Sequence, residues 1–241
     1  MKFLRVAAVT AGLIAFSTAT VSPASAATVT VDSISANWTN VVGGGSSVSN
    51  TVNGAGTAEL RWGGNAGFGQ SGYDFDPSAP PAFDVNSGEA FVIGNFTHIN
   101  MPIRSGTSID SAQLDVLVEI ASGGEPGPYL FSFLHDETPN RCSPRPNCAN
   151  DIVKISNLVT SDTFSIGDQL FTLSVLGFST DGGVTISDMF SSREKYTNSA
   201  KLYAEFVSVV PLPAALPLFL SMLAGMGFLR WWRKKTVSAA T

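Results

Sequence analysis

The chain has few side chains suited to acid–base or metal chemistry, and they fall in short groups. Its two histidines are His98, within Thr97-His98-Ile99-Asn100, and His135. On a β-strand, His98 and Asn100 share one face, whereas Thr97 takes the other. A histidine and an asparagine so placed could form a hydrogen-bonded corner that fixes the following loop, or could bind a metal or another ligand. The residues alone leave both interpretations open.

Acidic side chains gather in two further regions. Oxygen ligands on loops between strands suit Ca²⁺, which takes about 6–8 of them. Solvated acids in turns are the alternative, because neither a repeat nor EF-hand spacing is present. We therefore predict no obligatory cofactor and keep Ca²⁺ as a candidate ligand. The candidate residues for Ca²⁺ are Asp74, Asp76, Asp136, Glu137 and Asp151.

Motifs for catalysis are missing from the sequence. It has no Gly-x-Ser-x-Gly elbow, no His-Glu-x-x-His motif and no phosphate-binding loop. A serine triad or a pair of carboxylates can assemble only in space, so a hydrolase stays as an alternative. We predict that the protein is not an enzyme.

Arginine and aromatic residues alternate in Leu60-Arg61-Trp62-Gly63, with Ser71-Gly72-Tyr73 close behind. An arginine beside exposed aromatic rings is typical of surfaces that bind sugars. The alternative is that the rings belong to the core and only the arginine is solvated.

The only two cysteines are Cys142 and Cys148. An even number of cysteines at close spacing in an exported chain predicts a local disulfide between them. A metal site at these cysteines is the alternative, but no nearby histidine completes a tetrahedral set.

The body of the chain has the pattern of β-strands throughout. The runs alternate or are rich in β-branched and aromatic residues, and Gly, Pro, Asn, Asp and Ser bound them. They predict an all-β fold, a single antiparallel β-sandwich or jelly roll over residues 27–208. Residues 43–72 are the loosest stretch, and the glycine-rich segments 42–48 and 53–56 look like flexible loop. The predicted strands are 28–31, 91–99, 112–120, 129–134, 152–155, 170–178 and 201–209.

The charge of this body is strongly negative. It holds eight basic residues and all 19 acidic ones, a net charge of −11, although the whole chain carries only −5. Binding to nucleic acid needs a cationic face, so nucleic acid is excluded as a partner.

The first 26 residues have the three parts of a secretory signal peptide. Lys2 and Arg5 are followed by an apolar run from Val6 to Phe16 and by the small-residue cleavage site Ala24-Ser25-Ala26. The sequence thus predicts export of the body that begins at Ala27.

Residues 209–235 predict a membrane anchor. The 19 residues from Ala214 to Trp232 reach roughly 28 Å as a helix, which is enough to span a bilayer. A basic cluster follows and should remain cytoplasmic, and residues 236–241 form a tail. A buried core helix would explain neither the basic cluster nor the prolines before the helix. The stop residues are Arg230, Arg233, Lys234 and Lys235.

This C-terminal block, Val-Pro-Leu-Pro-Ala followed by an apolar helix and a basic end, resembles the PEP-CTERM sorting domain. The resemblance implies that an exosortase, a multi-spanning membrane enzyme of bacteria, recognises and cleaves the chain near the proline motif. The protein would then be an inner-membrane-anchored precursor before it reaches the cell surface or the extracellular matrix. The recognised motif would be Val210, Pro211, Leu212, Pro213 and Ala214.

The body resembles the THxN family of PEP-CTERM proteins, through Leu60-Arg61-Trp62-Gly63, Ser71-Gly72-Tyr73 and the run from Gly94 to Ile103. Thr97, His98 and Asn100 are the signature positions, and the resemblance implies no activity for them. We expect a structural or adhesive surface protein that contacts extracellular polysaccharide. A carbohydrate- or Ca²⁺-binding module is the alternative, ahead of a secreted hydrolase.

Overall fold

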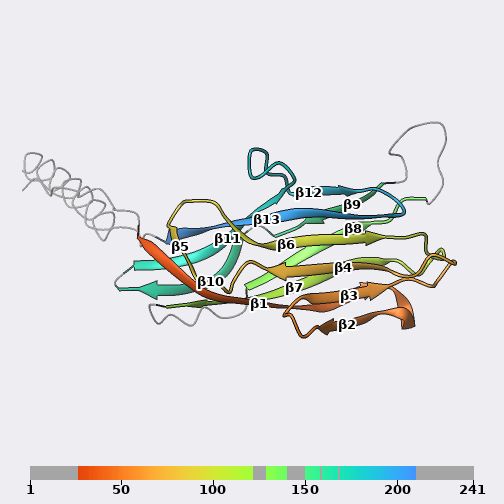
Figure 1. Cartoon of the computed structure of the whole chain (residues 1–241), viewed down its shortest axis with the longest axis horizontal. Coiled ribbons are helices and arrows are strands. Elements are labelled where there is room, and N and C mark those ends of the chain that lie inside the picture. The colour runs from red at the N-terminus through yellow and green to blue at the C-terminus, as the bar shows by residue number, and fades with distance from the viewer. Residues whose placement is uncertain (1–26, 122–128, 140–149, 158, 168, 210–241) are drawn as a thin grey trace, which may run out of the picture.

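The computed structural model of the chain describes residues 27–121, 129–139, 150–157, 159–167 and 169–209 (Figure 1). They form two antiparallel sheets around one hydrophobic core, which confirms the all-β, sandwich-like fold. The predicted signal peptide, the disulfide between Cys142 and Cys148, and the sorting motif with its membrane segment lie outside these residues. Within the described ranges, no helix is long and apolar enough to cross a membrane.

One sheet has six strands. They are β1 (Thr28–Gly43), β5 (Phe83–Asn86), β7 (Ile109–Ile120), β8 (Tyr129–Asp136), β9 (Asp151–Ile155) and β12 (Met189–Ser192). Their order across the sheet is β12-β9-β8-β7-β1-β5.

The other sheet has seven strands. They are β2 (Ser49–Val52), β3 (Ala58–Trp62), β4 (Ser71–Pro77), β6 (Phe91–Asn100), β10 (Val159–Ile166), β11 (Gln169–Ser179) and β13 (Tyr196–Val209). Their order is β10-β11-β13-β6-β4-β3-β2. A short 3₁₀ helix, η1 (Gly45–Ser47), joins β1 to β2 across the two sheets.

All seven predicted strands are present, most of them longer than predicted. The flexible loop predicted for residues 42–48 is wrong in part, because the end of β1 and η1 lie there, whereas residues 53–56 form the turn between β2 and β3. The strands β2 and β3 were not predicted. The glycines made these elements hard to predict from the sequence. Gly43, Gly44 and Gly45 all take positive φ in the turn that leads out of β1, so they belong to an ordered turn.

Alternation of side chains fixes which face of each strand is buried. In β6, Phe96 and His98 point into the core, whereas Thr97 and Ile99 are partly exposed on the other face. The fully buried Trp38 lies amid the core rings, with its centroid 5.3 Å from those of Tyr73 and Phe133. Burial of such side chains stabilises the sandwich by about 1.5–3 kcal/mol each.

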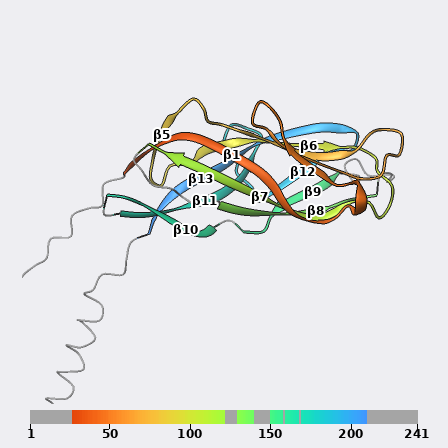
Figure 2. The ribbon, with the colours of Figure 1, turned by 90° about the horizontal axis from the view of Figure 1, so that it is seen from below.

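The described chain enters and leaves the sandwich at the same end, which we call the terminal pole (Figures 1 and 2). The turn between β5 and β6 contacts both ends of the chain there. Ser87 N donates to Ala27 O at 2.8 Å, and Gly88 N donates to Phe206 O at 2.9 Å. The opposite end, where β6 and β8 end and β9 begins, is the distal pole.

Candidate functional site

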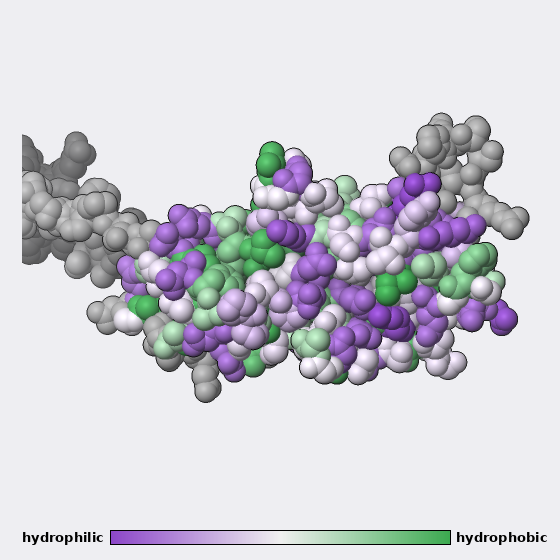
Figure 3. All heavy atoms as spheres, viewed as in Figure 1, coloured by the Kyte–Doolittle hydropathy of each residue, from purple (hydrophilic) through white to green (hydrophobic). Residues whose placement is uncertain are grey.

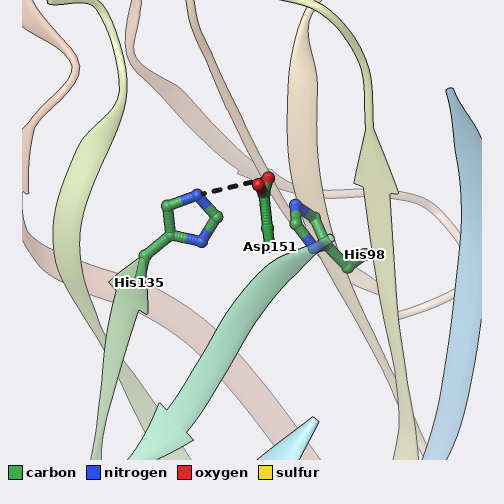
Figure 4. Close-up of side chains that lie close together, drawn as sticks. All are labelled: His98, His135 and Asp151. Atoms are coloured by element: carbon green, nitrogen blue, oxygen red, sulfur yellow. Dashed lines mark ion pairs between the residues drawn. The ribbon is translucent and has the colours of Figure 1, made fainter. Parts of the chain in front are cut away.

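Three polar side chains meet inside the sandwich near the distal pole (Figure 4). His98 comes from β6 in the seven-stranded sheet, whereas His135 and Asp151 come from β8 and β9 in the other sheet. His98 and Asp151 are fully buried, and His135 is 8 % exposed. Their potential ligand atoms all lie within 4.8 Å of one another. We refer to these three residues as the His–Asp cluster.

The strand pattern explains why these polar groups point inward. His98 follows the buried Phe96, and His135 follows the buried Phe133. Asp151 precedes the buried Val153. Each cluster residue therefore occupies an inward position where the alternation calls for an apolar side chain.

Aromatic rings enclose the two imidazoles. Tyr73 is paired with His98 across β4 and β6, and its hydroxyl shares a hydrogen bond of 2.6 Å with His135 Nδ1. Trp62 stacks on His98 with centroids 5.8 Å apart and meets His135 edge to face at 5.2 Å. These contacts fix both ring planes, so that His135 Nε2 faces the acids of the cluster.

Two carboxylates lie beside His135, and a third lies close enough to interact with those two. Asp151 Oδ1 accepts hydrogen bonds from Thr138 N at 2.9 Å and Thr138 Oγ1 at 3.2 Å. His135 Nε2 lies 3.2 Å from Glu137 Oε2 and 3.9 Å from Asp151 Oδ2. Glu194, in the turn between β12 and β13, is the third and is 9 % exposed.

Burial disfavours charge on these groups. It raises the pKa of Asp151 to about 6 and the pKa of Glu194 to about 7, and the negative charge of Glu137 adds to both shifts. It also lowers the pKa of His98 well below 6.5, with a further contribution from His135. Burial raises the pKa of Tyr73 well above 10.0. His98 and Tyr73 are therefore neutral at pH 7, and the acids repel one another.

Several buried polar atoms of the site have no hydrogen-bond partner among the described residues. They are both ring nitrogens of His98, Asp151 Oδ2, both Glu194 oxygens, Asn100 Oδ1 and Trp62 Nε1. Native proteins pair the large majority of such atoms, because an unpaired buried polar group costs about 1–3 kcal/mol. All except the nitrogen of Trp62 and the protonated nitrogen of His98 offer a lone pair rather than a proton.

The signature residues divide as the strand pattern predicts. Asn100 is buried on the same face as His98, and its Nδ2 donates to Ser192 O at 2.9 Å, which ties β6 to the end of β12. Thr97 lies on the outer face, where its hydroxyl is 2.8 Å from Ser199 Oγ. The hydrogen bond of Asn100 thus reaches β12 rather than the loop that follows β6, and His98 does not take part in it.

The structure separates the five Ca²⁺ candidates. Asp74 pairs with Arg61, and Asp76 accepts a hydrogen bond from Thr57 Oγ1 at 3.3 Å, both on the seven-stranded sheet. Asp136 ends β8 on the exposed face.

Glu137 and Asp151 are the two candidates that come together, on either side of His135 Nε2.

Arg61 and its aromatic neighbours do not form a surface for stacking on sugars. Trp62 and Tyr73 are fully buried, and Arg61 is paired with Asp74 and with Glu59, at 3.5 Å from the latter. The alternative of core rings is confirmed for this segment, whereas the arginine is ion-paired and only 26 % exposed.

A pocket of about 500 Å³ opens beside the cluster. Arg104, Gly106 and Ser108 line one part of it, and Glu137 and Thr138 line another. Because Glu137 contacts His135 and Thr138 contacts Asp151, this wall separates the His–Asp cluster from solvent.

Sequence reasoning missed His135 and Glu194 as members of the site. A signal existed for His135, because it continues the inward series Tyr129, Phe131, Phe133 at two-residue spacing. Glu194 lies in a turn, where an acid is ordinary, so no local pattern marks it.

Comparison of the chain with protein-family models and with curated proteins gives no match.

Proposed function

We propose that the chain is an exported bacterial protein of the cell surface or extracellular matrix, with a structural or adhesive and non-catalytic role. In this proposal an exosortase-type enzyme processes the C-terminal signal after a transient stay in the inner membrane. Extracellular polysaccharide is the material that we propose the protein contacts there.

The position of the two chain ends supports this proposal most directly. Ala27 and Phe206 both contact the β5–β6 turn at the terminal pole. His98 is paired with Asn198, so Phe206 lies eight residues farther along β13, about 27 Å away. A membrane segment attached after Val209 would hold the terminal pole at the membrane and present the distal pole outward.

The surface of the described domain is mostly hydrophilic, which agrees with a domain that faces water. Figure 3 shows hydrophilic residues spread over the visible face, with hydrophobic ones in separate small groups. Most of the described aromatic rings lie inside instead, with Phe68 and Tyr196 as exposed exceptions. A net charge of −11 on the body favours solubility and disfavours binding to anionic partners such as nucleic acid.

Neither histidine is set up as the base of a serine nucleophile within the described part of the chain. His135 is bonded to Tyr73 and Glu137, and no described hydroxyl group of a serine bonds to His98. This arrangement supports the non-catalytic role.

A fusion experiment tests the export. Alkaline phosphatase, which folds only in an oxidising compartment, is attached after Ser208 in a chain that keeps residues 1–26. We expect activity in intact cells, and none from a matched fusion that starts at Ala27. Equal activity of the two fusions, or activity of neither, would contradict the proposed topology.

A further inference from the structure

We propose that His98, His135 and Asp151 bind one divalent transition-metal ion of the Zn²⁺ class and thereby join the two sheets near the distal pole. This inference does not depend on the export of the protein.

The unpaired atoms of the cluster are of the kind that bind a cation. His98 is fully buried, and neither of its ring nitrogens has a hydrogen-bond partner in the described ranges. Asp151 Oδ2 is likewise buried and unpaired, and it lies 3.9 Å from His135 Nε2. A neutral imidazole and a carboxylate both offer lone pairs to the same space, and only a proton donor or a metal ion satisfies both.

The surroundings orient these donors as a metal site requires. The hydroxyl of Tyr73 lies 2.6 Å from His135 Nδ1 and can accept a hydrogen bond from Nδ1–H, and in that tautomer the Nε2 lone pair is free to bind a metal. Thr138 holds Asp151 Oδ1 with two hydrogen bonds and leaves Oδ2 facing the histidines. Such outer partners are characteristic of metal ligands, because they fix the tautomer and the direction of each donor.

The geometry fits a small ion. Bond lengths of about 2.0–2.2 Å place neighbouring ligands of a tetrahedral Zn²⁺ roughly 3.4 Å apart. The three donor atoms already lie within 4.8 Å of one another, so small side-chain rotations bring them to bonding distance. Glu137 Oε2 lies 3.2 Å from His135 Nε2, beside the three donor atoms but not among those within 4.8 Å of one another.

Ligand type selects the metal. Ca²⁺ and Mg²⁺ prefer oxygen ligands throughout, whereas imidazole nitrogen suits Zn²⁺, Co²⁺, Cu²⁺ and related ions. Two histidines with one carboxylate therefore favour the latter group. A dication would also reduce the repulsion among Asp151, Glu137 and Glu194, which outweighs the attraction of Lys195 for Glu194.

The test uses the full chain, purified in mild detergent without a histidine tag, stripped with a chelator, and titrated separately with Zn²⁺, Co²⁺, Ca²⁺ and Mg²⁺. We expect one Zn²⁺ per chain, a higher thermal midpoint with Zn²⁺, and the visible absorption of tetrahedral Co²⁺. Ca²⁺ and Mg²⁺ should leave the midpoint unchanged. Substoichiometric Zn²⁺, or a response to Ca²⁺ alone, would overturn the proposal.

Variants locate the site. Loss of a residue that only orients a metal ligand weakens metal binding about 10–100-fold. Asp151 and His98 are themselves proposed ligands, so Asp151→Asn and His98→Gln should each weaken Zn²⁺ binding by more than about 100-fold. Asp136→Asn is the matched control, because this exposed acid lies next to His135 and points away from it. Its affinity should stay within about twofold of the wild type. Equal affinity of Asp151→Asn and the wild type would overturn the assignment.

A measurement on the wild type covers the case in which the variants do not fold. His98 and His135 are the only histidines of the chain, so an imidazole ¹⁵N NMR spectrum contains signals from two rings alone. Zn²⁺ should shift one ring nitrogen of each. Binding of Zn²⁺ with both rings unchanged would show that the ion sits elsewhere and contradict the proposal.

Discussion

At the scale of single residues, Tyr73 links the two sheets by a polar contact. Its ring belongs to β4 of the seven-stranded sheet, and its hydroxyl bonds to His135 Nδ1 on β8 of the other. The group is buried and its pKa lies well above 10.0, so it stays protonated at every physiological pH. The bond therefore persists, whichever tautomer His135 adopts.

Replacement of Tyr73 by Phe should destabilise the protein, because it keeps the ring but leaves His135 Nδ1 without its partner. We expect a loss of about 1–3 kcal/mol in the free energy of unfolding, measured by urea denaturation. Tyr196→Phe is the control, since Tyr196 is 49 % exposed, and its effect should stay within about 0.5 kcal/mol. Equal effects of the two substitutions would contradict a structural role for the hydroxyl.

A second residue, Asp181, stabilises the loop after β11. Its carboxylate accepts hydrogen bonds from Thr185 N at 2.9 Å and Ser179 Oγ at 2.7 Å, which lower its pKa from 3.8 to about 2. The carboxylate form is thus favoured in the folded state. Its contribution is complete above pH 3.8 and disappears as the pH falls through about 2.

Asp181→Asn should therefore unfold more readily than the wild type at neutral pH, and the difference should shrink on acidification from pH 4 to pH 2. Thermal unfolding midpoints at a series of pH values measure it. Asp188→Asn serves as a control on the same stretch of chain. A difference that stays constant down to pH 2 would show that the loop does not depend on the ionised carboxylate.

At the scale of elements, the alternation of side chains made seven strands predictable, including β6 with its buried His98 and Asn100. The same alternation could not predict which strands lie opposite each other across the core. His98 and His135 meet because β6 and β8 belong to different sheets that face one another. Glu194 joins them from a turn, and the pairing of sheets is a long-range property that no local window contains.

One strand carries a testable packing constraint. A Cβ atom at Gly94 of β6 would lie 2.4 Å from Phe75 Cζ and 2.7 Å from Asp76 O. Gly94→Ala should therefore destabilise the protein by about 1–3 kcal/mol through overpacking, as measured by chemical denaturation.

Gly54→Ala is the matched control for this substitution. No atom lies within 4 Å of a Cβ built at Gly54, and its turn is exposed. The control should change stability by less than about 0.5 kcal/mol. A Gly94→Ala protein as stable as the control would show that β4 and β6 can separate without loss.

At the scale of the whole molecule, the sequence predicted the sandwich, whereas only the three-dimensional structure placed the first and last strands of the described body against the same turn. Export and sorting stay predictions. Pro211 and Pro213 follow β13 within a few residues. Prolines interrupt regular structure and leave an extended segment that a processing enzyme can bind.

Replacement of Pro211 and Pro213 by Ala should leave export intact and trap a longer, membrane-bound form, because the proposed recognition motif is lost. Immunoblots of membrane and extracellular fractions measure the two forms, and mass spectrometry of the wild type should find a C-terminus near the motif. A mature protein that retains residues through Thr241 would show that the segment is a permanent anchor instead.

The location of β13 decides how the sandwich resists mechanical force. β11 pairs with β13 over residues 201–209 on one side, and β6 pairs with it over residues 196–204 on the other. Backbone hydrogen bonds in antiparallel ladders run perpendicular to the strands. A pull at Val209 along the axis of β13 loads both ladders in shear, so their bonds must break together rather than one after another. If the protein has the proposed role at the cell surface, tension on this end would thus act along a direction in which two ladders of hydrogen bonds resist it together.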